Sequence, residues 1–253
     1  MSADQSIDTD ERQADGVRSV AATHPGTRRM HNEDAWLNRP DLGLWAVADG
    51  AGGHDNGAAA ARAVIAGLDA IPAGLSAAEM LAQVRMRLEG THRSLTEATE
   101  RQGGGMMAST VVALIMRQGH FAFLWIGDSR AYLLRNGVLD QVTVDHSLVQ
   151  ELLDRGAISA ADAENHPQAN VITRAIGAAG TQAAADKRTG LALPGDRFLL
   201  CSDGVSKAVA AADLAVQLSA GADARAIVAE ALARMAGDNV TALTIDVGDH
   251  PTG

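Results

Sequence analysis

Residues 109–142 read STVVALIMRQGHFAFLWIGDSRAYLLRNGVLDQV, and this stretch decides the class of fold. It contains four apolar runs of strand length, at 109–116, 120–126, 131–134 and 138–142. Short pairs rich in glycine separate the runs: Gln118-Gly119, Gly127-Asp128 and Asn136-Gly137. Because parallel neighbours need a crossover of about a dozen residues, these short connections predict an antiparallel meander.

Helix and strand patterns flank this stretch on both sides. Two long helices are expected over 56–71 and 76–101, and the second opens with Ser76 and Glu79 in capping-box spacing. Strands are expected over 17–23, 44–48, 197–201 and 240–247, and shorter helices over 147–155, 159–164, 211–219 and 223–236. Long helices that bracket antiparallel strands favour an α+β layered fold over a doubly wound parallel sheet.

Composition limits the class of protein. The 253 residues include 31 acidic and 21 basic side chains, and the net charge of −10 disfavours nucleic-acid binding, which needs clustered Lys and Arg. The longest apolar run without glycine, 111–116, is far shorter than the roughly 20 residues of a membrane span. A single cysteine, Cys201, excludes an internal disulfide and is expected to pack in the core. We expect a disordered acidic tail over 1–16 and one domain over 17–253, in a cytoplasmic monomer that does not bind membranes.

Acidic residues recur at the ends of the expected strands and in the turns beside them. They are Asp34, Asp49, Asp128, Asp203 and Asp238. Each one alone fits ordinary turn chemistry, because Asp-Gly and Asp-Asn pairs favour turns. Carboxylates gathered at one end of a layered core would repel one another unless a cation is bound. Oxygen ligands without cysteine suit hard divalent ions such as Mg²⁺ or Mn²⁺.

Five short motifs contain these acids: RRMHNED at 28–34, ADGAGGH at 48–54, GDSR at 127–130, CSDG at 201–204 and DNVT at 238–241. Their order and spacing resemble the metal-dependent 2C-type Ser/Thr protein phosphatase family in its bacterial single-domain form. The resemblance implies a four-layer αββα sandwich, in which helices flank two antiparallel β-sheets. It also implies hydrolysis of phosphoserine and phosphothreonine in proteins by a metal-bridged hydroxide, opposing a Ser/Thr kinase.

The resemblance further implies a set of metal ligands. Asp49 matches the aspartate that bridges two Mn²⁺ or Mg²⁺ ions, and the carbonyl oxygen of Gly50 matches a ligand of the second ion. Asp203 and Asp238 match the remaining carboxylates at the first ion. Asp128 matches a ligand of a weaker third ion.

Three more residues match groups that act on water or substrate. Asp34 matches an acid that holds metal-bound water, and Arg29 matches the arginine that grips the substrate phosphate. His54 matches a histidine near the site, which could protonate the leaving oxygen. The alternatives are a surface charge for Arg29, a turn support for His54, and for Asp128 a turn residue paired with Arg130.

Other stretches bear on the branch of the family and on rival functions. Ala-Ser-Thr stands at 108–110 where the family commonly has Gly-Thr-Thr, and we expect the neighbouring side chains to repack around it. Residues 145–175 match the mobile flap of the family, and we expect His146 in a loop or on the surface. Residues 107–110, 145–150 and 170–174 resemble the branch encoded with bacterial type VI secretion systems. A catalytically silent phosphoprotein-binding scaffold would lack metal ligands, and a calcium-stabilised domain would gather its acids in one loop of about 12 residues.

Overall fold

Two antiparallel β-sheets stack face to face in a computed structural model, which describes residues 6–52, 56–164, 166–180 and 182–248. One sheet has the strand order β1-β2-β12-β11-β8-β9. These strands are β1 (Asp8–Ala14), β2 (Val17–His24), β12 (Val240–Val247), β11 (Arg197–Cys201), β8 (Arg130–Arg135) and β9 (Val138–Gln141). The other sheet has the order β10-β7-β6-β4-β3, and β5 pairs with β4 beside it. Its strands are β10 (Asp186–Leu191), β7 (His120–Ile126), β6 (Val111–Arg117), β4 (Leu44–Gly52), β3 (Asp34–Arg39) and β5 (Met107–Ser109).

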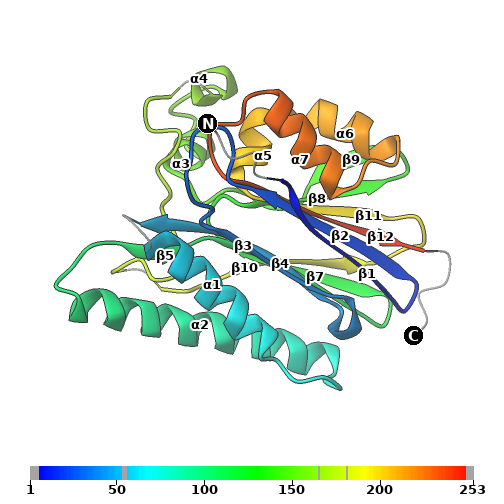
Figure 1. Ribbon diagram of the computed structural model, residues 1–253, viewed down its shortest axis with the longest axis horizontal. Helices are drawn as coiled ribbons and strands as arrows, with labels where there is room; N and C mark the ends of the chain where they lie inside the picture. Colours follow the sequence, from blue (N-terminus) through cyan, green and yellow to red (C-terminus); the bar gives the residue numbers. More distant parts are fainter. Residues whose placement is uncertain (1–5, 53–55, 165, 181, 249–253) are drawn as a thin grey trace.

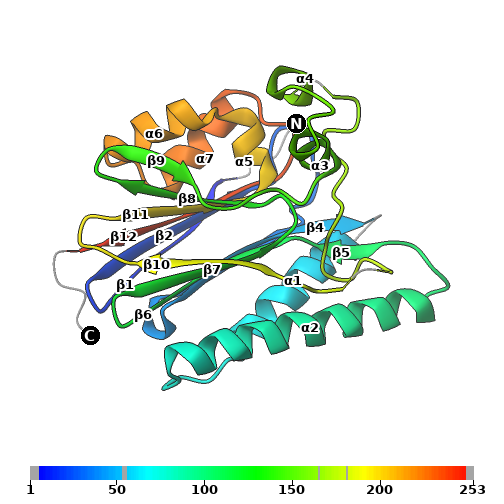
Figure 2. The ribbon, with the colours of Figure 1, turned by 180° about the vertical axis from the view of Figure 1, so that it is seen from behind.

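Helices cover the outer faces of both sheets (Figure 1). Helices α1 (Asn56–Asp69) and α2 (Ala77–Arg101) pack on the sheet that contains β4. Helices α5 (Asp203–Ala208), α6 (Ala211–Ser219) and α7 (Ala224–Ala233) pack on the sheet that contains β12. The short helices α3 (Leu148–Asp154) and α4 (Ala160–Glu164) lie at one end of the sandwich (Figure 2), and η1 (Pro40–Leu42) joins β3 to β4. The expected four-layer αββα sandwich is therefore confirmed.

Strand β6 shows why the central strands read as continuous apolar runs. Val111, Ala113 and Ile115 contact the core beneath α1 and α2. The alternate residues Val112 and Leu114 contact the core between the two sheets. A strand buried on both faces must be apolar at every position, because successive side chains point to opposite sides.

Helix α2 begins where the sequence predicts. The side chain of Ser76 accepts a hydrogen bond from the backbone N–H of Glu79, and the Glu79 carboxylate accepts one from the backbone N–H of Ser76. This capping box satisfies two donors that the helix itself cannot satisfy. Within the described ranges, no helix has the length and apolar character needed to cross a membrane.

The predicted meander is wrong at one connection. Strands β6 and β7 pair as expected, and so do β8 and β9, but β7 and β8 belong to different sheets. The chain crosses between the sheets at Gly127, whose φ is +107°, and β8 then pairs with β11. A short connection restricts the direction of the next strand, but it does not determine which strand the next one pairs with. The pairing of β8 depends on how both of its faces are buried.

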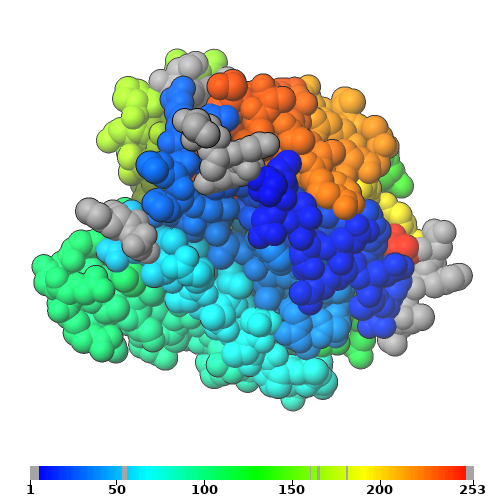
Figure 3. Space-filling view, viewed as in Figure 1, coloured from blue at the N-terminus to red at the C-terminus, as the bar shows by residue number. Residues whose placement is uncertain are grey.

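The expected disordered tail over 1–16 is wrong for residues 8–14, which form β1. This strand pairs with β2 from Asp8 opposite Thr23 to Ala14 opposite Val17, and the two strands lie between the helix layers in Figure 3. Asp15 and Gly16 both have positive φ, 48° and 74°, as a tight hairpin turn requires. Backbone pairing orders the strand despite its polar side chains, and these charges suit a solvent-exposed sheet edge. Residues 1–5 lie outside the described part of the chain.

Candidate metal centre

Five aspartates meet at one end of the sandwich, which we call the acidic end. They come from strand termini: Asp34 begins β3, Asp49 lies near the end of β4, Asp128 follows β7, Asp203 follows β11 and Asp238 precedes β12. Asp34 and Asp49 are direct cross-strand partners. Burial is the main cause that raises the pKa of Asp49 well above its ordinary value, and the charges of the other four aspartates all add to it. The structure therefore brings together all five carboxylates that the sequence predicts at the site.

Asp34 is held by two hydroxyl groups. Its Oδ2 accepts hydrogen bonds from Ser202 Oγ (2.8 Å) and Thr241 Oγ1 (2.6 Å). Its Oδ1 is buried and has no hydrogen-bond partner within the described ranges. Burial is the main cause that raises the pKa of Asp34 to about 7, the charges of Asp203 and Asp238 add to it, and the two hydroxyls oppose it. The motifs at 201–204 and 238–241 contain Ser202 and Thr241, but residue spacing alone does not indicate that their hydroxyls meet at Asp34.

The backbone around Asp49 is fixed by Thr110. Thr110 Oγ1 accepts a hydrogen bond from the Asp49 N–H (3.0 Å), and the Thr110 N–H donates to the Asp49 carbonyl oxygen (2.8 Å). The preceding Ser109 pairs with Gly50 in the β4–β5 ladder. A Cβ atom on Gly50 would lie 2.1 Å from the carbonyl oxygen of Gly57, so this close approach requires glycine.

Asp128 occupies the crossing between the sheets. Its side chain is 6% exposed, and Oδ1 has no hydrogen-bond partner among the residues that the structure describes. Burial, followed by the charge of Asp203, raises its pKa to about 7. Arg130 forms its ion pair with Asp145 (2.7 Å), which removes the basis for treating Asp128 as the turn partner of Arg130.

His146 holds the turn that carries Asp128. The ring Nδ1 of His146 accepts a hydrogen bond from the Gly127 N–H (3.0 Å), and the backbone N–H of His146 donates to the Gly127 carbonyl oxygen (2.9 Å). Its Nε2 lies 3.2 Å from Asp186 Oδ2. The ring lies in a loop as expected, but only 4% of His146 is exposed, so the surface alternative is wrong. Burial and the charge of Arg174 lower the pKa of His146.

The remaining two aspartates pair with basic side chains of the same chain. Asp203 Oδ2 accepts a hydrogen bond from Lys207 Nζ, one helical turn further along α5. Asp238 contacts both ends of the Arg29 fork, with Nε to Oδ1 at 2.9 Å and Nη2 to Oδ2 at 3.0 Å. The Arg29 and Asp238 side chains are 53% and 42% exposed, so this pair is open to solvent.

The chemistry of the acidic end fits divalent cations. The Oδ1 atoms of Asp34 and Asp128, which are buried and have no hydrogen-bond partner among the described residues, are hard oxygen donors. Burial, and after it mutual repulsion, raises the pKa of Asp34, Asp49 and Asp128. In the described part of the chain, no three His, Cys, Asp or Glu side chains are already grouped to hold one ion. His54 lies outside the described residues.

Cys201 is fully buried in the core on the outer face of the β11 sheet. Burial raises the pKa of its thiol to about 12, which keeps it protonated and excludes a nucleophilic role at neutral pH. The prediction that Cys201 is a core residue is therefore confirmed.

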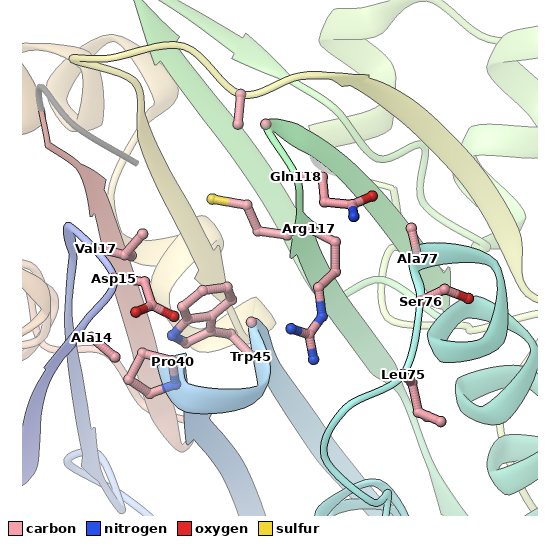
Figure 4. Close-up of a pocket in the computed structure, with 14 residues that line it drawn as sticks. Ala14, Asp15, Val17, Pro40, Trp45, Leu75, Ser76, Ala77, Arg117 and Gln118 are labelled. Atoms are coloured by element: carbon pink, nitrogen blue, oxygen red, sulfur yellow. The ribbon is translucent and has the colours of Figure 1, made fainter. Parts of the chain in front are cut away.

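A hollow of about 280 Å³ lies at the opposite end of the sandwich (Figure 4). Its lining comes from the β1–β2 turn, the β3–β4 connection, the β6–β7 turn and the start of α2, and it includes Trp45 and Arg117. None of the predicted site residues that the structure describes lines this hollow, so it is separate from the acidic end.

Comparison with known proteins decides the family. The sequence model described as Protein phosphatase 2C matches residues 25–243, which contain all eight predicted site residues. The chain belongs to the protein phosphatase 2C family. The resemblance carried by the five motifs is thereby confirmed, and metal dependence is a property of this family.

Relatives of this protein phosphatase 2C chain include bacterial Ser/Thr phosphatases. PstP of Mycobacterium tuberculosis is 35% identical over 244 residues, which are 94% of this chain and 46% of PstP, so the chain spans about half the length of that relative. PppA, described as a key regulatory component of T6SS in Pseudomonas aeruginosa, has a TM-score of 0.83 at 39% identity, covering 91% of this chain and 97% of PppA. The catalytic domain of PstP, solved in complex with 2 manganese ions, has a TM-score of 0.76 at 32% identity and covers 92% of this chain and 99% of that domain.

Proposed function

We propose that this protein hydrolyses phosphoserine and phosphothreonine in other proteins, with divalent ions held at the acidic end. The observation that carries the proposal is the convergence of five carboxylates, distant in sequence, within a chain of the protein phosphatase 2C family. The two manganese ions in the PstP catalytic domain support two ions here, and we favour Mn²⁺ over Mg²⁺ on that ground.

Asp49, Asp203, Asp238 and the carbonyl oxygen of Gly50 would hold the two ions. When bound, such ions lower the pKa of water and neutralise phosphoryl oxygens. The glycine at position 50 lets the backbone approach the site, and the Thr110 hydrogen bonds hold Asp49 in position. Asp128 is the residue that the family resemblance matches to the ligand of a weaker third ion.

Asp34 would orient the attacking water. Because the hydroxyls of Ser202 and Thr241 occupy its Oδ2, the buried Oδ1 is left to accept a hydrogen bond from that water. The same two hydroxyls restrict rotation of the carboxyl group. Because the Asp34 carboxyl is already held in position, little reorganisation of the site is needed during the reaction.

Arg29 would bind the substrate phosphate. Its fork already contacts two carboxylate oxygens of Asp238, and the same geometry suits two phosphate oxygens. Its exposure allows a phosphorylated segment of another protein to reach it. His54 remains the proposed donor of a proton to the leaving serine or threonine oxygen.

The partners would be phosphorylated proteins and a Ser/Thr kinase that the enzyme opposes. The likeness to PppA supports a role in regulating a type VI secretion system. A cytoplasmic location and a monomeric state remain predictions.

The test is metal-dependent release of phosphate from a phosphothreonine peptide by the purified protein with Mn²⁺. We expect EDTA to abolish turnover and Asp203→Asn to reduce it by at least about a hundredfold. Asp140→Asn, an exposed acid on β9, is the matched control and should keep full activity. Bound Mn²⁺ should also raise the melting temperature, because it stabilises the native state by mass action. Turnover that persists in EDTA would overturn the proposal.

A further inference from the structure

Lys207 places an ammonium group against Asp203 at the acidic end, with its side chain 44% exposed. It is one of only two lysines in the chain, the other being Lys187 on β10. Its Nζ donates to Asp203 Oδ2 and to Asn170 Oδ1, the latter at 2.7 Å. A lysine ammonium in contact with a carboxylate carries a positive charge at neutral pH, so Asp203 already has a cation beside it.

Asp128 is the second acid that the ammonium influences. The positive charge of Lys207 favours the ionised form of the Asp128 carboxyl. Asp128 is also the residue that the family resemblance matches to a third-ion ligand, and its buried Oδ1 has no hydrogen-bond partner among the described residues. A divalent ion bound between Asp128 and Asp203 would have to lie beside a positive ammonium group, and the two would repel.

We infer that the Lys207 ammonium takes the place of the third metal ion, so that the protein binds two divalent ions and no third. The inference rests on the proposed function, because it concerns the same acidic end. A lysine suits this place because its ammonium is a compact point charge, whereas an arginine presents a broad planar fork.

The bond from Lys207 to Asn170 extends the effect to the predicted flap. Asn170 lies in the 145–175 segment, and Ser147 and Ile172 of that segment are joined by a β-bridge. The same ammonium thus neutralises Asp203 and ties this segment to the start of α5. A metal ion in place of the ammonium could neutralise the acids, but it would not supply the hydrogen bond that Lys207 donates to Asn170.

The test counts Mn²⁺ bound per chain by equilibrium dialysis and elemental analysis of the full-length protein. We expect two ions in the wild type and in Lys207→Arg, which keeps the charge. Lys207→Met and Lys207→Gln should each bind a third, weaker ion. The double variant Lys207→Met with Asp128→Asn should return to two, because the carboxylate that binds the third ion is then removed. Lys187→Met is the matched control and should bind as the wild type does.

Two results would overturn the inference. One is three Mn²⁺ ions bound by the wild type, and the other is an unchanged count in both neutral variants at position 207. Failure of the proposed function gives a different result, since the wild type would then bind no Mn²⁺ and release no phosphate from the phosphothreonine peptide.

Discussion

Asp128 allows a direct measurement of how much a buried, repelled carboxylate destabilises the metal-free protein. Its side chain is 6% exposed, and burial together with the charge of Asp203 raises its pKa from 3.8 to about 7. Asp128→Asn keeps the shape of the side chain and removes its charge. We expect the variant to be more stable than the wild type at about pH 8 when both proteins are free of metal.

Stability falls with rising pH because the native state holds a proton on Asp128 that the unfolded state releases. Between the unfolded pKa of 3.8 and the native pKa of about 7, the native state keeps a proton on Asp128 that the unfolded state has released. Protonation therefore favours the native state in this window, and the free energy of unfolding falls as the pH rises through it. Above about pH 7 the contribution of Asp128 becomes constant.

The size of the effect follows from the same shift. A difference of about three pKa units corresponds to about 4 kcal/mol of destabilisation at about pH 8, at roughly 1.4 kcal/mol per unit. About 3 kcal/mol of this accumulates between about pH 5 and about pH 8. The wild type should lose at least this much stability over that interval, because Asp34 and Asp49 also have raised pKa values. Asp128→Asn should lose about 3 kcal/mol less than the wild type.

The assay is urea unfolding of dialysed, metal-free protein at about pH 5 and about pH 8. Asp140→Asn, which removes an exposed charge on β9, is the control and should follow the wild type. Equal loss of stability in the wild type and in Asp128→Asn would refute the reasoning, since burial would then not raise the pKa of Asp128.

Two further substitutions test the turn and the phosphate contact. Gly127→Ala should lower the free energy of unfolding by about 3 kcal/mol, because φ is +107° and a Cβ atom would lie 2.6 Å from Thr110 Cβ. Gly137→Ala, with φ of +76° but no atom of the described residues within 4 Å of the added Cβ, should cost only about 1 kcal/mol in urea unfolding. Equal losses in the two variants would contradict the role of the Thr110 contact. Arg29→Lys should raise KM for the phosphothreonine peptide about tenfold through loss of the two-pronged contact, whereas Arg28→Lys should leave it unchanged. The same KM in both variants would argue against Arg29 as the phosphate ligand.

Elements that are buried on both faces could be predicted from the sequence alone. The strands expected over 197–201 and 240–247 coincide with β11 and β12. Both are rich in apolar and β-branched residues and are bounded by polar or glycine turns, so local composition already marks their ends. The capping pair Ser76 and Glu79 likewise locates the start of α2, because its hydrogen bonds are local.

Three edge strands were not predicted, because their composition is polar. Strands β1, β3 and β10 carry many polar residues and were not predicted as strands. Each is the outermost strand of its sheet and extends only because a neighbour offers free backbone groups. The crossing at Gly127 also depends on long-range pairing, since a short turn can join two strands of one sheet or pass between two sheets.

The sequence by itself determined which acids are candidates for the site, their order along the chain and the family to which the chain belongs. Only the tertiary structure decided what surrounds each acid: the hydroxyls at Asp34, the buried turn at Asp128, and the lysine beside Asp203. A motif records residue types along the chain, whereas a pKa and a cation site depend on groups brought together from distant strands. The surroundings of the five aspartates therefore follow from how the strand ends converge, and sequence spacing alone does not contain that information.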